Sequence, residues 1–197
     1  MTPGEVCREV LSDWIFFNES SGGVTFSGGE PLLQIPFLKK TLMILKESGI
    51  HTAVDTCGYS TEEELREIID LTDLFLYDLK IMDEEEHKRY CGVSNRRILS
   101  NLQFLYEQNK KVIIRFPVIP GINDSGENID SMISCMLKMS DRFRDIDLLP
   151  YHSLAREKYF RFGSTNKLSG LPDLKKENLL PVKQAFESAG FNVQIGG

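Results

Sequence analysis

The sequence at positions 24–31 is Val24-Thr25-Phe26-Ser27-Gly28-Gly29-Glu30-Pro31, which predicts a short β-strand that ends in a pair of glycines. Glycine has no Cβ, so the backbone amides and carbonyls of such a pair can lie directly against a bound ligand. Glu30 then places a carboxylate at the edge of the same turn. A helix with leucines at helical spacing follows and ends near Gly49, which completes one βα unit.

The same βα pattern repeats along the rest of the chain. Further strands are predicted at 52–55, 74–79, 111–118, 146–149 and 192–195, and helices at 2–18, 61–69, 83–90, 95–109, 127–139 and 174–189. Strands that alternate with helices are typical of a parallel sheet with right-handed crossovers. Five to six strands are fewer than the eight of a closed barrel, so we expect an α/β fold, a partial (βα) barrel. Residues 1–197 are expected to form this single domain.

The first predicted element is a helix rather than a strand. Thr2-Pro3-Gly4-Glu5 is a capping box with proline at the first helical position. Because a βα repeat begins with a strand, we expect the first strand of the barrel to be missing from this sequence.

The amino-acid composition limits the kinds of partner that the chain can bind and the cellular compartment in which we expect it. The chain of 197 residues carries a formal net charge of −6, which argues against a nucleic acid or an acidic membrane as partner. It has no signal-peptide pattern and no apolar run of about 18 residues, so we expect a cytoplasmic protein. The four cysteines, at positions 7, 57, 91 and 135, are too far apart in the sequence to share one chelating loop, and we interpret them as free thiols.

Polar residues recur where the predicted strands end. They are Gly28, Gly29, Glu30, Asp55, Asp78, Lys80, Arg115, Asn123 and His152. The carboxyl ends of parallel strands meet at one rim, where ligands bind in α/β folds. The sequence therefore predicts a binding site at this rim.

Two carboxylates at that rim require a compensating charge. Like charges about 6 Å apart repel by roughly 3 kcal/mol at an effective dielectric constant near 20. We expect the balance for Asp55 and Asp78 to come from Lys80, which lies on the same strand face as Asp78, or from a bound metal ion. The alternative is that Asp55 caps the following turn and Lys80 lies in solvent.

Arg115 and the three histidines are interpreted by their neighbours. Arg115 lies in a predicted strand whose side chains alternate between two faces. One of these faces points into the barrel, and there we expect Arg115 to contact a ligand or to form a structural ion pair. His152 follows Pro150-Tyr151 at a strand end and is a candidate ligand contact. His51 and His87 lack such a context and are expected at the surface.

Together with further motifs, the Gly-Gly-Glu-Pro stretch resembles the glycyl-radical-enzyme activating enzymes, which are radical S-adenosylmethionine proteins; the activating enzymes of pyruvate formate-lyase are the most similar group. The motifs are Asp55-Thr56-Cys57-Gly58, Tyr77-Asp78-Leu79-Lys80, Arg115 with Pro120-Gly121-Ile122-Asn123-Asp124, and Leu149-Pro150-Tyr151-His152. The likeness covers nearly the whole chain, to about Ile195, and implies a partial (βα)6 barrel.

The resemblance also implies roles for individual residues. S-adenosylmethionine would be held by Gly28, Gly29, Glu30, Asp55, Asp78, Leu79, Lys80 and His152. The backbone of the glycine stretch would bind the methionyl amino group, and His152 the nucleoside. Arg115 would contact the cofactor or the substrate peptide, and a monovalent cation is held near Asp55 and Asp78 in some members.

In the resembled family a CxxxCxxC loop near the N-terminus holds a [4Fe-4S] cluster, and this sequence contains no such loop. The family carries other residue types at the position of Cys57, which we therefore interpret as a spectator. The implied full-length enzyme generates a glycyl radical on a partner such as pyruvate formate-lyase, with electrons from flavodoxin or ferredoxin. This chain is expected to retain only the S-adenosylmethionine and substrate half, and to be inactive alone.

Two alternatives remain open from the sequence. The chain is a non-catalytic binding remnant that docks on a glycyl-radical enzyme, or Lys80 is a Schiff-base lysine of an aldolase-like barrel.

Overall fold

The computed structural model describes residues 1–20, 22–152 and 171–196. Its strands are β1 (Gly23–Phe26), β2 (His51–Thr56), β3 (Leu74–Asp78), β4 (Val112–Val118), β5 (Asp145–Pro150) and β6 (Asn192–Ile195). Its helices are α1 (Pro3–Ser12), α2 (Trp14–Ser20), α3 (Ile35–Glu47), α4 (Glu62–Arg66), α5 (Glu84–Cys91), α6 (Arg96–Glu107), α7 (Gly126–Leu137) and α9 (Leu180–Ser188), with 3₁₀ turns η1 (Pro31–Gln34), η2 (Ile69–Leu71) and η4 (Lys176–Leu179).

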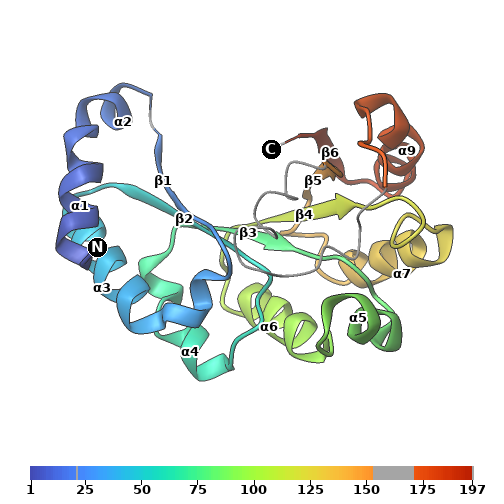
Figure 1. Ribbon diagram of the computed structural model, residues 1–197, viewed down its shortest axis with the longest axis horizontal. Helices are drawn as coiled ribbons and strands as arrows, with labels where there is room; N and C mark the ends of the chain where they lie inside the picture. Colours follow the sequence, from blue (N-terminus) through green and yellow to red (C-terminus); the bar gives the residue numbers. More distant parts are fainter. Residues whose placement is uncertain (21, 153–170, 197) are drawn as a thin grey trace.

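The strands form one sheet in sequence order, β1-β2-β3-β4-β5-β6, and every neighbouring pair is parallel. Figure 1 shows the sheet curving between β1 and β6, with α3 to α7 along its outer side. This arrangement confirms the predicted α/β fold and is consistent with a partial barrel.

Burial alternates along the strands, which assigns a role to each face of the sheet. In β4 every second residue from Val112 to Val118 is buried, and the residues between them, Arg115 included, are only half-buried. The buried face packs against the helices. The half-buried face is the inner wall of the partial barrel, and it carries the polar side chains.

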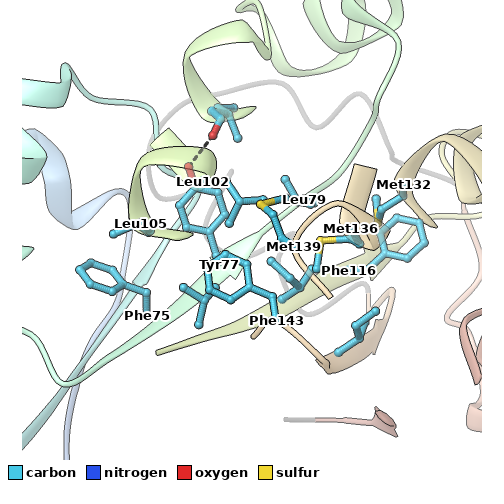
Figure 2. Close-up of a cluster of buried hydrophobic side chains, with 14 of the residues drawn as sticks. Phe75, Tyr77, Leu79, Leu102, Leu105, Phe116, Met132, Met136, Met139 and Phe143 are labelled. Carbon is cyan, nitrogen blue, oxygen red and sulfur yellow. Dashed lines mark hydrogen bonds between the residues drawn. The ribbon is translucent and has the colours of Figure 1, made fainter. Parts of the chain in front are cut away.

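The main core lies between the sheet and its outer helices. Figure 2 shows Phe75 and Tyr77 of β3 and Phe116 of β4 packed with leucines of α6 and methionines of and near α7. Tyr77 is fully buried, and its hydroxyl donates a hydrogen bond of 2.7 Å to the carbonyl of Ile98 in α6. That bond satisfies the phenol where water cannot reach it.

Two predicted helices differ from the observed ones. The helix expected over 2–18 is divided at Asp13 into α1 and α2. Ser12 and Asp13 compete with the helix for backbone hydrogen bonds, and the Ser12 hydroxyl donates to the Glu9 carbonyl at 2.6 Å. The helix expected over 174–189 starts as the 3₁₀ turn η4, and Pro181 lies in the first turn of α9, where proline is tolerated.

Strand β1 forms an edge of the sheet and, within the described residues, pairs only with β2. It has no lysine, proline or bulge to discourage further pairing. Helix α2 lies nearby in Figure 1, and its Trp14, Ile15 and Phe16 side chains are 47%, 62% and 68% exposed. Open backbone groups and uncovered apolar area both favour association.

We therefore expect the chain to self-associate through β1 and α2. Sedimentation velocity should show a concentration-dependent shift for the wild type that Phe16→Lys suppresses. Leu180→Lys, at an exposed apolar residue of α9, is the matched control and should leave the shift unchanged. A wild-type chain that stays monomeric up to high concentration would contradict this expectation.

Within the described residues, no helix combines the length and the apolar character that crossing a bilayer requires.

Candidate functional site at the carboxyl ends of the strands

The half-buried face of the sheet gathers charged side chains on four adjacent strands. Asp55 and Asp78 lie near the carboxyl ends of their strands, whereas Arg115, predicted at a strand end, lies in the middle of β4. Arg115 of β4 is paired in register with Asp78 of β3 on one side and with Asp147 of β5 on the other. Paired residues of parallel strands point to the same face, so these three form a row across the sheet. Asp55 of β2, whose register partner is Leu76, lies on the same face next to this row.

Asp55 and Asp78 each have their own cation. Nη1 of Arg115 lies 2.6 Å from Oδ2 of Asp55, and Nζ of Lys80 lies 3.4 Å from Oδ2 of Asp78. Ser27 adds a hydrogen bond of 2.8 Å from its hydroxyl to Oδ2 of Asp55. The prediction that Lys80 balances this pair is confirmed for Asp78, and the second cation is Arg115, which reaches across β3.

Two atoms at this site are buried and have no hydrogen-bond partner among the described residues, namely Oδ1 of Asp78 and Nε of Arg115. Burial raises the pKa of the Asp78 carboxyl; Lys80 opposes this and the charge of Asp55 adds to it. A buried acceptor without a donor is costly, and a ligand with an N–H group would satisfy it.

Lys80 is held as a cation. Burial by itself lowers the pKa of the Lys80 ammonium, but the attraction of Asp78, with smaller contributions from Cys57 and Cys91, outweighs it and the pKa rises. A Schiff-base lysine needs the opposite, a lowered pKa that yields a neutral amine. The aldolase-like alternative therefore has no support in this geometry.

The glycine pair opens onto a cleft of about 150 Å³ beside these charges. Gly28 has a φ of +136°, a conformation that favours glycine. A Cβ at Gly28 or Gly29 would meet no atom of the described residues within 4 Å. The cleft is lined by Ser27, Gly28, Gly29, Glu30, Asp55, Thr56, Cys57, Asp78 and Lys80.

The carboxylate of Glu30 is turned toward the end of β2. It accepts hydrogen bonds from the Thr56 hydroxyl at 2.5 Å, from the Cys57 amide at 2.9 Å and from the Leu32 amide at 3.1 Å. Sγ of Cys57 lies 2.9 Å from the same carboxylate. Burial, then the hydrogen bond to Glu30, raises the pKa of the Cys57 thiol to about 11, so this thiol is a neutral donor.

The loop after β3 is fixed by two asparagines. Asn123 is 1% exposed, and its amide group donates to the carbonyls of Lys80 and Pro117 at 3.1 Å and 2.8 Å. Asn128 donates to the Lys80 carbonyl at 3.3 Å. Leu79, predicted to bind the cofactor, is buried in the core, and its amide donates to the Arg115 carbonyl at 2.9 Å. Asn123, which was predicted to lie at the rim, therefore fixes the backbone of Lys80 through a hydrogen bond.

The histidines separate into different environments. His152 is exposed directly after β5, and the 18 residues that follow it lie outside the described part of the chain. His51 is exposed at the start of β2, as predicted. His87 was expected at the surface, and that prediction is wrong: it is 3% exposed, with Nδ1 2.7 Å from the Val93 carbonyl. The turn after α5 covers it, which helical spacing in the sequence could not indicate.

The cysteines lie on separate elements, in α1, after β2, at the end of α5 and in α7. Among the described residues, no three histidine, cysteine, aspartate or glutamate side chains converge in a way that could hold a metal ion. These residues therefore do not fit a four-iron cluster, which needs several thiolates at one point.

Sequence reasoning missed several residues of the site. They are Ser27, Thr56, Asn128 and Asp147, together with Cys57 as a hydrogen-bond donor. Asp147 could have been found, because it alternates with apolar residues in a predicted strand and so faces the inner wall. The contacts of Ser27 and Asn128 depend on loop geometry that leaves no periodic signal.

Comparison with known proteins assigns the chain to a family. Residues 4–133 match the profile of the Radical SAM superfamily. The trans-4-hydroxy-L-proline dehydratase activating enzyme of Clostridioides difficile is 37% identical over 98% of this chain, which covers 64% of that enzyme. The pyruvate formate-lyase 1-activating enzyme of Escherichia coli K12 is 37% identical over 99% of this chain, which covers 80% of that enzyme.

Solved structures agree with this assignment. A crystallised domain of a pyruvate-formate lyase-activating enzyme from Bacteroides vulgatus matches with a TM-score of 0.74 and 33% identity, over 89% of this chain and 99% of that one. Streptococcus suis SuiB matches with a TM-score of 0.75 at 15% identity, a likeness that shows the fold alone. The chain spans just under two thirds of the first two curated relatives. It belongs to the radical S-adenosylmethionine superfamily and, within it, to the glycyl-radical-enzyme activating enzymes.

Proposed function

We propose that this chain binds S-adenosylmethionine at the rim cleft and, as a single partial-barrel domain, forms the cofactor and substrate half of an enzyme that activates a glycyl-radical enzyme. The observation that carries the proposal is Oδ1 of Asp78, which has no hydrogen-bond partner among the described residues and lies beside the ammonium of Lys80 in the cleft that the glycine pair also lines. One carboxylate, one ammonium and accessible backbone groups match the amino-acid end of S-adenosylmethionine, which carries both an ammonium and a carboxylate.

The ligand's parts fit different residues. The ammonium of S-adenosylmethionine would be accepted by Asp78 and by carbonyls near Gly28 and Gly29, and its carboxylate would face Lys80. His152, which is exposed just after β5, would contact the nucleoside. The cation that some family members hold near Asp55 and Asp78 competes in this chain with Arg115, whose guanidinium already contacts Asp55.

The described residues do not fit the [4Fe-4S] cluster. In activating enzymes that cluster supplies the electron which cleaves S-adenosylmethionine. In the full-length protein we expect flavodoxin or ferredoxin to supply the electron in turn, and this chain alone to be inactive. A cytoplasmic location is supported by the four cysteines, all of them free in the described structure.

The partner is proposed to be pyruvate formate-lyase or a related glycyl-radical enzyme. The names of the relatives support this class, since they are activating enzymes of a dehydratase, two lyases, a synthase and a decarboxylase. Arg115 supports it structurally, because its buried Nε lacks a partner among the described residues and faces the inner wall. A backbone carbonyl of a peptide in the barrel would satisfy that N–H. A binding remnant that only docks on the partner remains the second candidate.

Calorimetric titration with S-adenosylmethionine tests the proposal. We expect weak but saturable binding to the wild type, because the rim residues are present whereas the described residues do not fit a cluster. His152→Ala should weaken the affinity by about tenfold, the usual effect of losing one or two ligand contacts. His51→Ala, an exposed histidine at the opposite end of β2, is the control. No binding to the wild type, or equal loss in both variants, would refute the assignment.

A further inference from the structure

The Glu30 carboxylate is surrounded by donors from its own chain. Its Oε1 accepts from the Thr56 hydroxyl and the Leu32 amide, and its Oε2 accepts from the amide and the thiol of Cys57. An ionised carboxylate offers about four acceptor positions. All of them are engaged, so a ligand ammonium could bind Glu30 only by displacing one of these donors.

These contacts join the ends of two strands. Glu30 follows the glycine pair and caps η1, while Thr56 and Cys57 end and follow β2. The Thr56 hydroxyl oxygen accepts from the Gly58 amide at 2.9 Å, and the Gly58 carbonyl accepts from Asn101 of α6 at 2.8 Å. A continuous chain of hydrogen bonds therefore runs from the glycine turn to the outer helix layer.

We propose that Glu30 is a positioning residue that fixes the Gly28-Gly29 turn to the end of β2, and that Cys57 belongs to this clamp as a thiol donor. Both side chains line the cleft, but neither then forms a hydrogen bond or ion pair with bound S-adenosylmethionine. Two expectations from the sequence change as a result, since Glu30 was expected to bind the cofactor and Cys57 to be a spectator. The raised pKa of Cys57 agrees with a thiol that keeps its proton next to a carboxylate. The ligand part of this inference rests on the proposed function.

The Glu30→Gln variant tests the clamp because every partner of Glu30 is a donor. A glutamine amide must turn its NH₂ group toward either the Leu32 or the Cys57 amide, and both cannot be satisfied. Hydrogen exchange measured by NMR, without ligand, should speed up by about tenfold or more at residues 32, 57 and 58. Glu63→Gln, an exposed residue of α4, is the charge-matched control and should leave these amides unchanged.

Substitution of Cys57 separates a hydrogen-bond role from simple filling of space. Cys57→Ala removes one donor and should weaken S-adenosylmethionine binding by about two- to tenfold, the effect of one hydrogen bond. Cys57→Ser keeps a donor and should restore the affinity. Glu30→Gln should weaken binding more than Cys57→Ala does.

Each outcome decides the inference. If Glu30→Gln weakens binding while exchange at residues 32, 57 and 58 is unchanged, Glu30 contacts the ligand directly and the inference is wrong. If exchange speeds up and binding is unaffected, the clamp has no role in ligand positioning, which also overturns it. A wild type that binds no ligand refutes the proposed function, and the positioning role fails with it, whereas the exchange data still report on the clamp.

Discussion

Replacing Gly58 by alanine is expected to destabilise the chain by about 3 kcal/mol. Gly58 has a φ of +71°, and an L-residue in this left-handed region costs about 1–2 kcal/mol. A Cβ there would lie 1.7 Å from the hydroxyl oxygen of Tyr77. Tyr77 is fully buried and tied to the Ile98 carbonyl, so it cannot move aside, and overpacking of this kind costs a further 1–3 kcal/mol or so.

Gly49→Ala is the matched control for this experiment. Gly49 has the same φ of +71°, but a Cβ there would meet no described atom within 4 Å. It should therefore show the cost of the left-handed backbone alone, about 1–2 kcal/mol. Urea unfolding of both variants measures the difference. Equal losses would show that Tyr77 yields to the added methyl group, and the rigid contact inferred between β2 and β3 would be wrong.

The strands were predictable because their signal is local. Apolar residues alternate or cluster over a few positions in each strand, and glycine or asparagine follows the helix before β2, β4 and β6, so the positions of β2 to β6 matched the expectation within a few residues. The break at Asp13 was not predictable from apolar spacing, because α1 and α2 continue the same pattern across it. Only the preference of Ser12 and Asp13 for backbone hydrogen bonds marks that boundary.

The sequence predicted where the site residues lie, at the rim of the sheet, but not which of their side chains bond to one another. Position at a strand end follows from the sequence, which is why Asp55, Asp78 and Lys80 were expected together. The direction of a long side chain depends on its three-dimensional neighbours. Arg115 reaches past β3 to Asp55 although its register partners are Asp78 and Asp147, and Glu30 bonds to the end of β2. No spacing rule encodes either choice.

Replacing Asp78 by asparagine should stabilise the free chain and nearly abolish S-adenosylmethionine binding. Oδ1 of the half-buried, ionised carboxylate is itself buried and has no partner among the described residues, so removing the charge is expected to add about 0.5–2 kcal/mol of stability. Lys80 keeps access to solvent, since its side chain is 35% exposed. Binding should fall by more than tenfold because the ligand ammonium loses a charged acceptor. Asp130→Asn, on the exposed face of α7, controls for net charge.

The stabilisation should depend on pH in a definite direction. The pKa of the Asp78 carboxyl is higher in the folded chain than its ordinary value of 3.8, chiefly because of burial. The folded state thus binds this proton more tightly than the unfolded state, and it gains stability as the pH falls through the raised pKa toward the ordinary one. At neutral pH the wild type bears the full cost of the ionised carboxylate, and Asp78→Asn does not. Thermal unfolding should therefore show the variant's advantage at neutral pH and its loss on acidification. An advantage that stays constant or grows as the pH falls would mean that Lys80 already compensates Asp78, and the buried Oδ1 would then no longer argue for a bound ligand.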